Sequence, residues 1–182
     1  MDTELVKLAQ HGDKGAFTTL AAARADRFLA VSNRILRDLS SAEDATQQAL
    51  LSIWQDLPQL RDPRRFDAWA YRLLVRACYS QADQNRRWTP NMRLLPTEEP
   101  MTADATSGVV DRDQLDRGFR RLSLDHRSVV VLHHYLDLPL DQVADALGIP
   151  VGTVASRLHY AMLALRSALD ADARSTTRGV AQ

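Results

Sequence analysis

The sequence predicts an all-α protein made of two small helical domains joined by a flexible linker. Glycine and proline are scarce outside one central stretch, no segment alternates like a strand, and apolar residues recur at helical spacing. Of the 182 residues, 45% are hydrophobic and 25% are charged, with a net charge of zero. These values are typical of globular proteins and exclude a disordered chain or a polybasic tail protein. The single cysteine, Cys78, excludes a disulfide framework.

The central stretch, residues 88–110, divides the chain. It contains Pro90, Pro96 and Pro100, and one basic residue stands against three acidic ones. Proline removes an amide donor and disfavours helix in the residue before it. We therefore predict a domain over 1–87, a linker over 88–110, a second domain over 111–170 and a tail over 171–182.

Four helices are predicted in the first domain. Ser40 and Glu43 form the pattern of a capping box, in which a serine oxygen and a glutamate satisfy free amides at a helix start. Asp67 is in position to cap the helix that follows a turn at 61–66. The predicted helices span 3–11, 13–37, 41–57 and 68–87.

The helix over 68–87 carries basic and aromatic residues at spacings of three and four, so they share one face. Residues 61–87 hold seven arginines against three acids. Arginine contacts phosphate and aromatic rings stack on unpaired bases, so this pattern suits nucleic acid. A plain solvated helix face is the alternative. The residues on the face are Trp69, Arg72, Arg76, Tyr79, Asp83 and Arg86.

The helix over 41–57 has a different exposed face. Its carboxylate and amide side chains surround one leucine, Leu51, while Ala45, Ala49, Ile53 and Leu57 can point inward. Such a face is typical of a surface on which another protein docks. A plain exposed helix fits the spacing equally well.

The second domain contains the pattern of a helix-turn-helix. Further helices are predicted near 112–121, 126–136, 140–147 and 151–169. Gly148 can adopt the left-handed conformation that ends the helix before it, and Ala144 is small where the two helices cross. Thr153, Ser156 and Arg157 then project from the start of a recognition helix. An ordinary helical hairpin is the less specific alternative.

The sequence contains no pattern typical of a metal site, a phosphate-binding loop or a catalytic nucleophile. The five histidines have no ligand spacing, and no glycine-rich phosphate loop or nucleophile arrangement is present. We therefore expect no catalytic residue, no metal and no cofactor. The acidic N-terminus is not a signal peptide and no apolar run is long enough to span a bilayer, so a cytoplasmic protein is expected.

Both domains resemble one family. Residues 38–57, with Ala42-Glu43-Asp44-Ala45, and residues 66–73 are similar to region 2 of the sigma-70-type RNA polymerase sigma factors. Residues 122–169 are similar to region 4. The length and order resemble the extracytoplasmic-function (ECF, group 4) sigma factors, which lack regions 1.1 and 3.

The resemblance implies a function for each surface. Core RNA polymerase would bind Asp44, Gln47, Gln48, Leu51 and Trp54. The −10 promoter element would be recognised and melted by Arg64, Arg65, Trp69, Arg72, Arg76, Tyr79, Asn85 and Arg86. The −35 element would be read by Thr153, Ala155, Ser156, Arg157, His159 and Tyr160.

The resemblance also implies regulation by an anti-sigma factor that covers these surfaces. The alternative is a helix-turn-helix transcriptional regulator that binds an operator without polymerase, usually as a dimer. The family often has Lys or Arg where Ala155, Tyr160 and Met162 stand, so we expect a smaller electrostatic contribution at the −35 element.

Overall fold

A computed structural model describes residues 2–88 and 116–179, which form helices and no strand. The N-terminal unit is a bundle of four α-helices, with two short 3₁₀ turns between the third and the fourth. In chain order these are α1 (Asp2–Gln10), α2 (Lys14–Leu36), α3 (Leu39–Asp56), η1 (Leu57–Gln59), η2 (Pro63–Arg65) and α4 (Phe66–Trp88).

The helices of this unit pack around buried apolar side chains. Leu20, Phe28, Ile35, Ile53 and Leu74 are at most 1% exposed. The inward positions of α3 are mostly alanine, and small side chains let α2 and α4 approach it closely. The predicted inward face of α3 is therefore confirmed, with Ala45, Ala49, Ile53 and Leu57 all buried.

Two predicted helix starts are wrong. Asp38, not Ser40, caps α3, and its carboxylate accepts the Ser41 amide at 2.8 Å. The helix therefore begins before the predicted capping box, and Ser41 turns inward. Similarly, α4 begins at Phe66 directly after η2, so Asp67 lies in its first turn and pairs with Arg24 at 2.7 Å instead of capping.

The C-terminal unit contains residues 116–121, which are helical, followed by α6 (Leu124–Val130), the π-helical turn η4 (Val131–Tyr135), α7 (Leu140–Leu147) and α8 (Val151–Gly179). Ser123 caps α6 at the His126 amide, 3.2 Å away. The predicted helix over 126–136 thus starts earlier and ends in a π turn. The last helix continues to Gly179, where a tail was predicted.

The helix-turn-helix is confirmed in its geometry. Gly148 has a φ of 67°, and the Ile149 amide donates to the Ala144 carbonyl at 3.1 Å. Val143 and Val154 are fully buried between α7 and α8. A left-handed residue thus ends α7 and turns the chain into α8.

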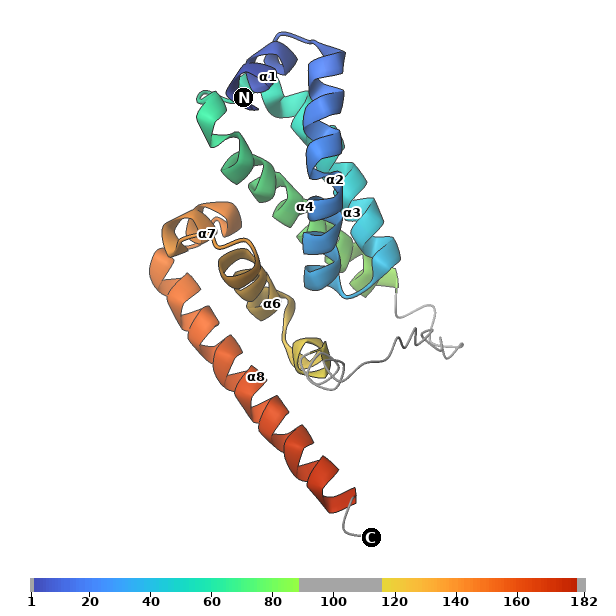
Figure 1. The fold of residues 1–182 in the computed structure, drawn as a ribbon, viewed down its shortest axis with the longest axis vertical. Helices are drawn as coiled ribbons and strands as arrows, with labels where there is room; N and C mark the ends of the chain where they lie inside the picture. Colours follow the sequence, from blue (N-terminus) through green and yellow to red (C-terminus); the bar gives the residue numbers. More distant parts are fainter. Residues whose placement is uncertain (1, 89–115, 180–182) are drawn as a thin grey trace.

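The two units lie against each other. In Figure 1, α7 lies beside α4, while α8 extends away from the bundle, and α6 contacts α2. Arg37 pairs with Asp116 at 3.2 Å, and the Arg34 guanidinium lies over the Tyr135 ring at 3.9 Å. Of the predicted linker, residue 88 belongs to α4 and the remainder lies outside the described residues. Among the described helices, none is long and apolar enough to cross a membrane.

Candidate functional site

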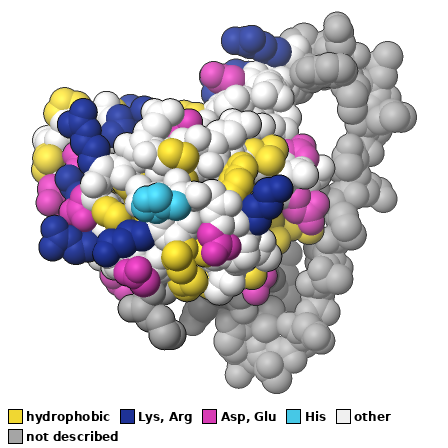
Figure 2. All heavy atoms as spheres, turned by 90° about the horizontal axis from the view of Figure 1, so that it is seen from above, with side chains coloured by type: hydrophobic (Ala, Val, Ile, Leu, Met, Phe, Trp, Pro, Cys, Tyr) yellow, Lys and Arg dark blue, Asp and Glu magenta, His cyan; other side chains and the backbone are white. Residues whose placement is uncertain are grey.

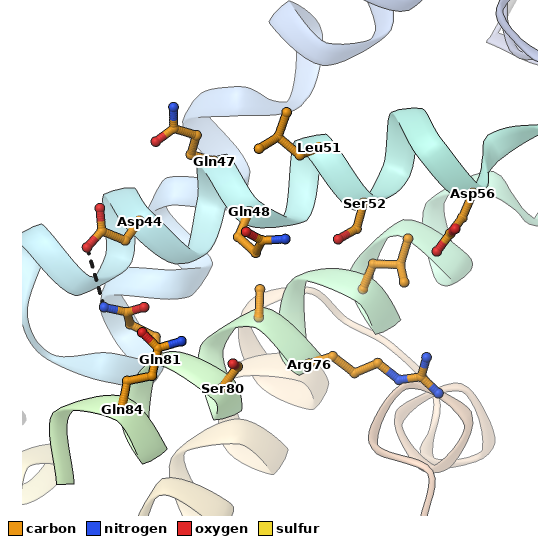
Figure 3. A pocket seen from close by; sticks show the side chains of 12 residues that line it. Asp44, Gln47, Gln48, Leu51, Ser52, Asp56, Arg76, Ser80, Gln81 and Gln84 are labelled. Atoms are coloured by element: carbon orange, nitrogen blue, oxygen red, sulfur yellow. Dashed lines mark hydrogen bonds between the residues drawn. The ribbon is translucent and has the colours of Figure 1, made fainter. Parts of the chain in front are cut away.

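The outer face of α3 presents polar side chains beside a groove. Asp44, Gln47 and Gln48 are exposed, and Gln81 of α4 donates to the Asp44 carboxylate at 3.4 Å. The groove between α3 and α4 has a volume of about 690 Å³. Figure 3 shows Gln48 and Ser52 on the edge of α3 toward α4, with Gln47 and Leu51 on the opposite edge.

A second, apolar hollow lies on that opposite edge, between α2 and α3. Its volume is about 390 Å³, and its lining includes the apolar side chains of Phe17, Leu50 and Trp54. The rings of Phe17 and Trp54 lie 4.7 Å apart. Leu51 borders both hollows and is 50% exposed. The predicted docking face is therefore a ridge, with a polar groove on one side and an apolar hollow on the other.

A basic surface begins at η2. Arg64 and Arg65 are exposed there, and Figure 2 shows Lys and Arg side chains gathered at the edge of the molecule where Figure 1 places this turn. A hydrogen bond from the Arg64 side chain at 3.2 Å lowers the pKa of Asp62. The ionised Asp62 therefore holds this turn while the guanidinium groups stay at the surface.

The basic surface continues along α4. Trp69 and Arg72 line a hollow of about 320 Å³ together with Arg65. Arg72, Arg76 and Tyr79 line a second hollow of about 420 Å³. We call Arg65, Trp69, Arg72, Arg76 and Tyr79 the basic stripe. Arg65 lies at the end of η2, and the other four members share one side of α4, as their spacing predicted.

Two predicted members of this surface have neighbours within the N-terminal unit. The Asn85 amide donates to Ser41 Oγ at 2.7 Å, so Asn85 ties α4 to the start of α3. Arg86 lies 3.9 Å from Asp83 on the same helix, and both side chains are exposed. Asn85 thus has a structural contact that its sequence position did not indicate.

The start of α8 presents the predicted recognition residues. Ala155, Ser156, His159 and Tyr160 are exposed, and Thr153 is half-buried. Arg157 is also half-buried, because its Nη2 lies 2.7 Å from the Asp125 carboxylate of α6. Most of the recognition face is therefore exposed, whereas Arg157 is held in an ion pair with Asp125.

Sequence reasoning missed the acidic residues that face the basic stripe. Asp125 accepts a hydrogen bond from the Tyr79 hydroxyl at 2.8 Å, and Asp145 of α7 lies 3.5 Å from Arg65. Burial raises the pKa of Tyr79 to about 12, so its hydroxyl stays a donor at neutral pH. No motif marks these aspartates, since their partners lie 46 and 80 positions away along the chain.

The remaining candidate chemistry gives no site. Cys78 is fully buried, and burial raises the pKa of its thiol to about 11. Within the described part of the chain, no three His, Cys, Asp or Glu side chains are grouped so that they could hold a metal ion.

The geometry defines a class of protein: a two-unit helical protein with a helix-turn-helix on one unit and a basic, aromatic helix on the other. Comparison with known families identifies both units. Residues 20–88 match the family model of sigma-70 region 2, and residues 112–165 match that of sigma-70, region 4.

Similar proteins agree over nearly the whole chain. The RNA polymerase sigma-E factor of Streptomyces avermitilis is 32% identical over 176 residues, which cover 92% of this chain and 94% of that protein. The ECF RNA polymerase sigma factor SigL of Mycobacterium tuberculosis is 32% identical over 139 residues, covering 75% of this chain and 78% of that protein. The chain belongs to the sigma-70 family of RNA polymerase sigma factors, in its extracytoplasmic-function group.

Solved structures share the fold. The sigma factor RpoE from Bartonella quintana, solved with the anti-sigma factor NepR, has a TM-score of 0.71 at 22% identity over 86% of this chain and 98% of that chain. CnrH, solved with the cytosolic domain of CnrY, has a TM-score of 0.69 at 22% identity over 94% of this chain and 98% of that chain. The prediction of a sigma factor is confirmed, and the stand-alone regulator is not supported.

Proposed function

We propose that this sigma factor binds core RNA polymerase through α3, contacts the −10 element through the basic stripe, and reads the −35 element through α8. The observation that carries the proposal is the half-exposed Leu51, which stands between two hollows on a helix whose opposite face is fully buried. The chain acts by binding, without catalysis of its own, in the cytoplasm where polymerase and DNA are found.

The α3 ridge has the features of a docking surface. A partner's apolar side chain can enter the hollow beside Leu51 and cover Trp54, while Asp44 and Gln48 supply a polar rim. Interfaces commonly combine an apolar centre with a polar edge. The Leu51 side chain becomes fully buried only when a partner docks. We therefore expect it to contribute more to the binding free energy than its polar neighbours.

The basic stripe suits a DNA strand that is being opened. Its guanidinium groups can bind phosphates, which supply affinity for any sequence. Trp69 is half-buried at the edge of a hollow, so one side of its ring can stack on an unpaired base. Melting requires stacking surfaces and positive charge, and the stripe provides both.

The recognition face of α8 suits duplex DNA. Ser156 and Thr153 can donate to phosphates, and Arg157 can pair with the guanine edge or with phosphate. Arg157 is the only basic residue among Thr153–Tyr160, so base contacts must contribute much of the −35 affinity.

We also propose that an anti-sigma factor holds this chain. The structure of RpoE with the anti-sigma factor NepR supports this, because this chain shares the fold of RpoE. A partner covering the α3 ridge would block polymerase directly. Affinity purification from cells should then recover one protein besides polymerase, and recovery of polymerase alone would refute the proposal.

Two substitutions test the division of roles in the full chain. Leu51→Asp should weaken binding to core polymerase at least tenfold, since it places a charge in the apolar contact. Arg157→Ala should leave polymerase binding unchanged and lower transcription from a two-element promoter about tenfold or more, in line with roughly 1–3 kcal/mol for an arginine–base contact.

The control for the first variant is Leu39→Asp. Leu39 is 55% exposed on the same helix but borders neither hollow, so this variant should bind polymerase normally. If Leu51→Asp and Leu39→Asp bound polymerase equally well, the docking surface would lie elsewhere than on the α3 ridge. Loss of polymerase binding in Arg157→Ala would refute the separate role of α8.

A further inference from the structure

We propose that Asp125 is a latch that closes the free sigma factor by holding a −10 side chain and a −35 side chain at the same time. Its carboxylate binds Tyr79 of the basic stripe and Arg157 of the recognition helix, so both promoter-reading surfaces are turned toward each other until polymerase separates them. The inference rests on the proposed roles of these two surfaces.

The geometry of the latch is specific. Tyr79 Oη donates to Asp125 Oδ1 at 2.8 Å, and Arg157 Nη2 lies 2.7 Å from Asp125 Oδ2. Each carboxylate oxygen therefore has its own partner, one from each unit of the chain. The side chains of Arg157 and Asp125 are 27% and 41% exposed, so water screens this pair less than a fully exposed one.

Neighbouring contacts support the closed arrangement without replacing the latch. Arg65 and Asp145 lie 3.5 Å apart, but both side chains are about two-thirds exposed, and such pairs stabilise little. Val75 of α4 and Ala146 of α7 are buried close to where these helices meet. Asp125 is the contact that engages residues from both DNA-reading surfaces.

The closed arrangement cannot read a promoter. The −35 and −10 elements are named for positions about 25 base pairs apart, which is about 85 Å of duplex at about 3.4 Å per pair. Here Tyr79 and Arg157 are both within 3 Å of one carboxylate group, at 2.8 and 2.7 Å. The two units must therefore separate before both elements can be contacted together.

Closure by the latch and binding of DNA or polymerase are thermodynamically linked, and this linkage has a measurable consequence. If only the open form binds promoter DNA or polymerase, closure lowers the apparent affinity for each by the same factor. Weakening the latch should then strengthen both interactions equally, although Asp125 lies outside the surface proposed to bind polymerase. A purely structural residue would not produce this paired gain.

The first test measures closure directly, without DNA or polymerase. Fluorescent labels on cysteines placed at the exposed positions Ala22 and Ser167 report the distance between the units in the full chain by energy transfer. Asp125→Ala and Tyr79→Phe should each lower the transfer efficiency, and Asp141→Ala should not. Tyr79→Phe removes one hydroxyl and leaves Asp125 in place at the start of α6. Unchanged efficiency in both latch variants would overturn the proposal.

The second test measures affinity. Asp125→Ala should bind a −35 duplex and core polymerase at least threefold more tightly than wild type, by similar factors. Asp141→Ala removes the same charge from an exposed position on α7 and is the matched control. An equal gain in DNA affinity from the control would show a general charge effect and overturn the latch. Absence of promoter binding in every variant would instead refute the proposed function, whatever the energy-transfer result.

Discussion

At the scale of single residues, Cys78 shows how burial controls chemistry in the N-terminal unit. Its thiol is fully buried and lies 3.5 Å from Ser32 Oγ, another buried group. Burial disfavours the thiolate and raises the pKa from 9.0 to about 11. Cys78 is thus a core side chain.

This shift predicts a loss of stability at high pH. Below pH 9 the thiol is protonated in the folded and the unfolded chain. Between about pH 9 and 11 only the unfolded chain releases the proton, so the free energy of unfolding should fall, by up to about 2–3 kcal/mol. Urea unfolding between pH 8 and 10.5 measures the fall, and Cys78→Ala should show a shallower slope. Parallel slopes for both proteins would contradict the assignment.

Residue-scale prediction from the sequence succeeded where helical spacing decides the outcome. Ala45, Ala49 and Ile53 are buried and Leu51 is exposed, because their positions around one helix follow from its period. The contacts of Tyr79 and Arg157 with Asp125 could not be predicted. The Tyr79 contact depends on how the two units pack, and the Arg157 contact on how α6 and α8 pack within one unit. Local spacing carries no information about either packing.

At the scale of elements, the turn between α7 and α8 fixes the direction of the recognition helix. Gly148 has a φ of 67°, and an added Cβ would meet nothing within 4 Å. A side chain there is therefore strained by the backbone conformation alone, at about 1–2 kcal/mol.

Gly148→Ala should accordingly lower the free energy of unfolding of the full chain by about 1 kcal/mol or more. Gly152→Ala is the control: Gly152 lies in the first turn of α8, and an added Cβ there also meets nothing within 4 Å. It should leave stability unchanged or raise it slightly, since alanine favours helix. Chemical denaturation of both variants decides the point, and equal losses would show that backbone strain is not the cause.

Element boundaries were less predictable than the elements themselves. The sequence pattern indicated a cap at Ser40, whereas the Asp38 carboxylate caps α3 and Ser41 is buried, where its hydroxyl accepts a hydrogen bond from Asn85. The π turn at Val131–Tyr135 has no residue signature, and it places His133 Nδ1 2.8 Å from the Leu138 carbonyl.

At the scale of the whole molecule, zero net charge conceals an arrangement of opposite charges between the units. Asp116, Asp125 and Asp145 of the C-terminal unit each pair with a residue of the N-terminal unit, two of them arginines. The same arginine-rich surface that suits phosphate is thus met by carboxylates in the closed chain. Composition alone could not distinguish this from an even spread of charge.

The length of chain between the units sets how far they can separate. Residues 89–115 can span at most about 95 Å when fully extended, against about 85 Å between the two promoter elements. Deleting residues 90–99 shortens that reach by about 35 Å. We expect the deletion to lower transcription from a two-element promoter at least tenfold while core polymerase still binds, because α3 is unchanged.

Replacing the same residues 90–99 with glycine and serine is the matched control, since it keeps the length and changes the composition. In vitro transcription with both variants as holoenzyme measures the difference, and the replacement should retain most of the wild-type activity. If the deletion variant transcribed as well as the replacement, reach would not limit the open form. If both failed equally, particular side chains in 90–99 would be required, and length would not be the cause.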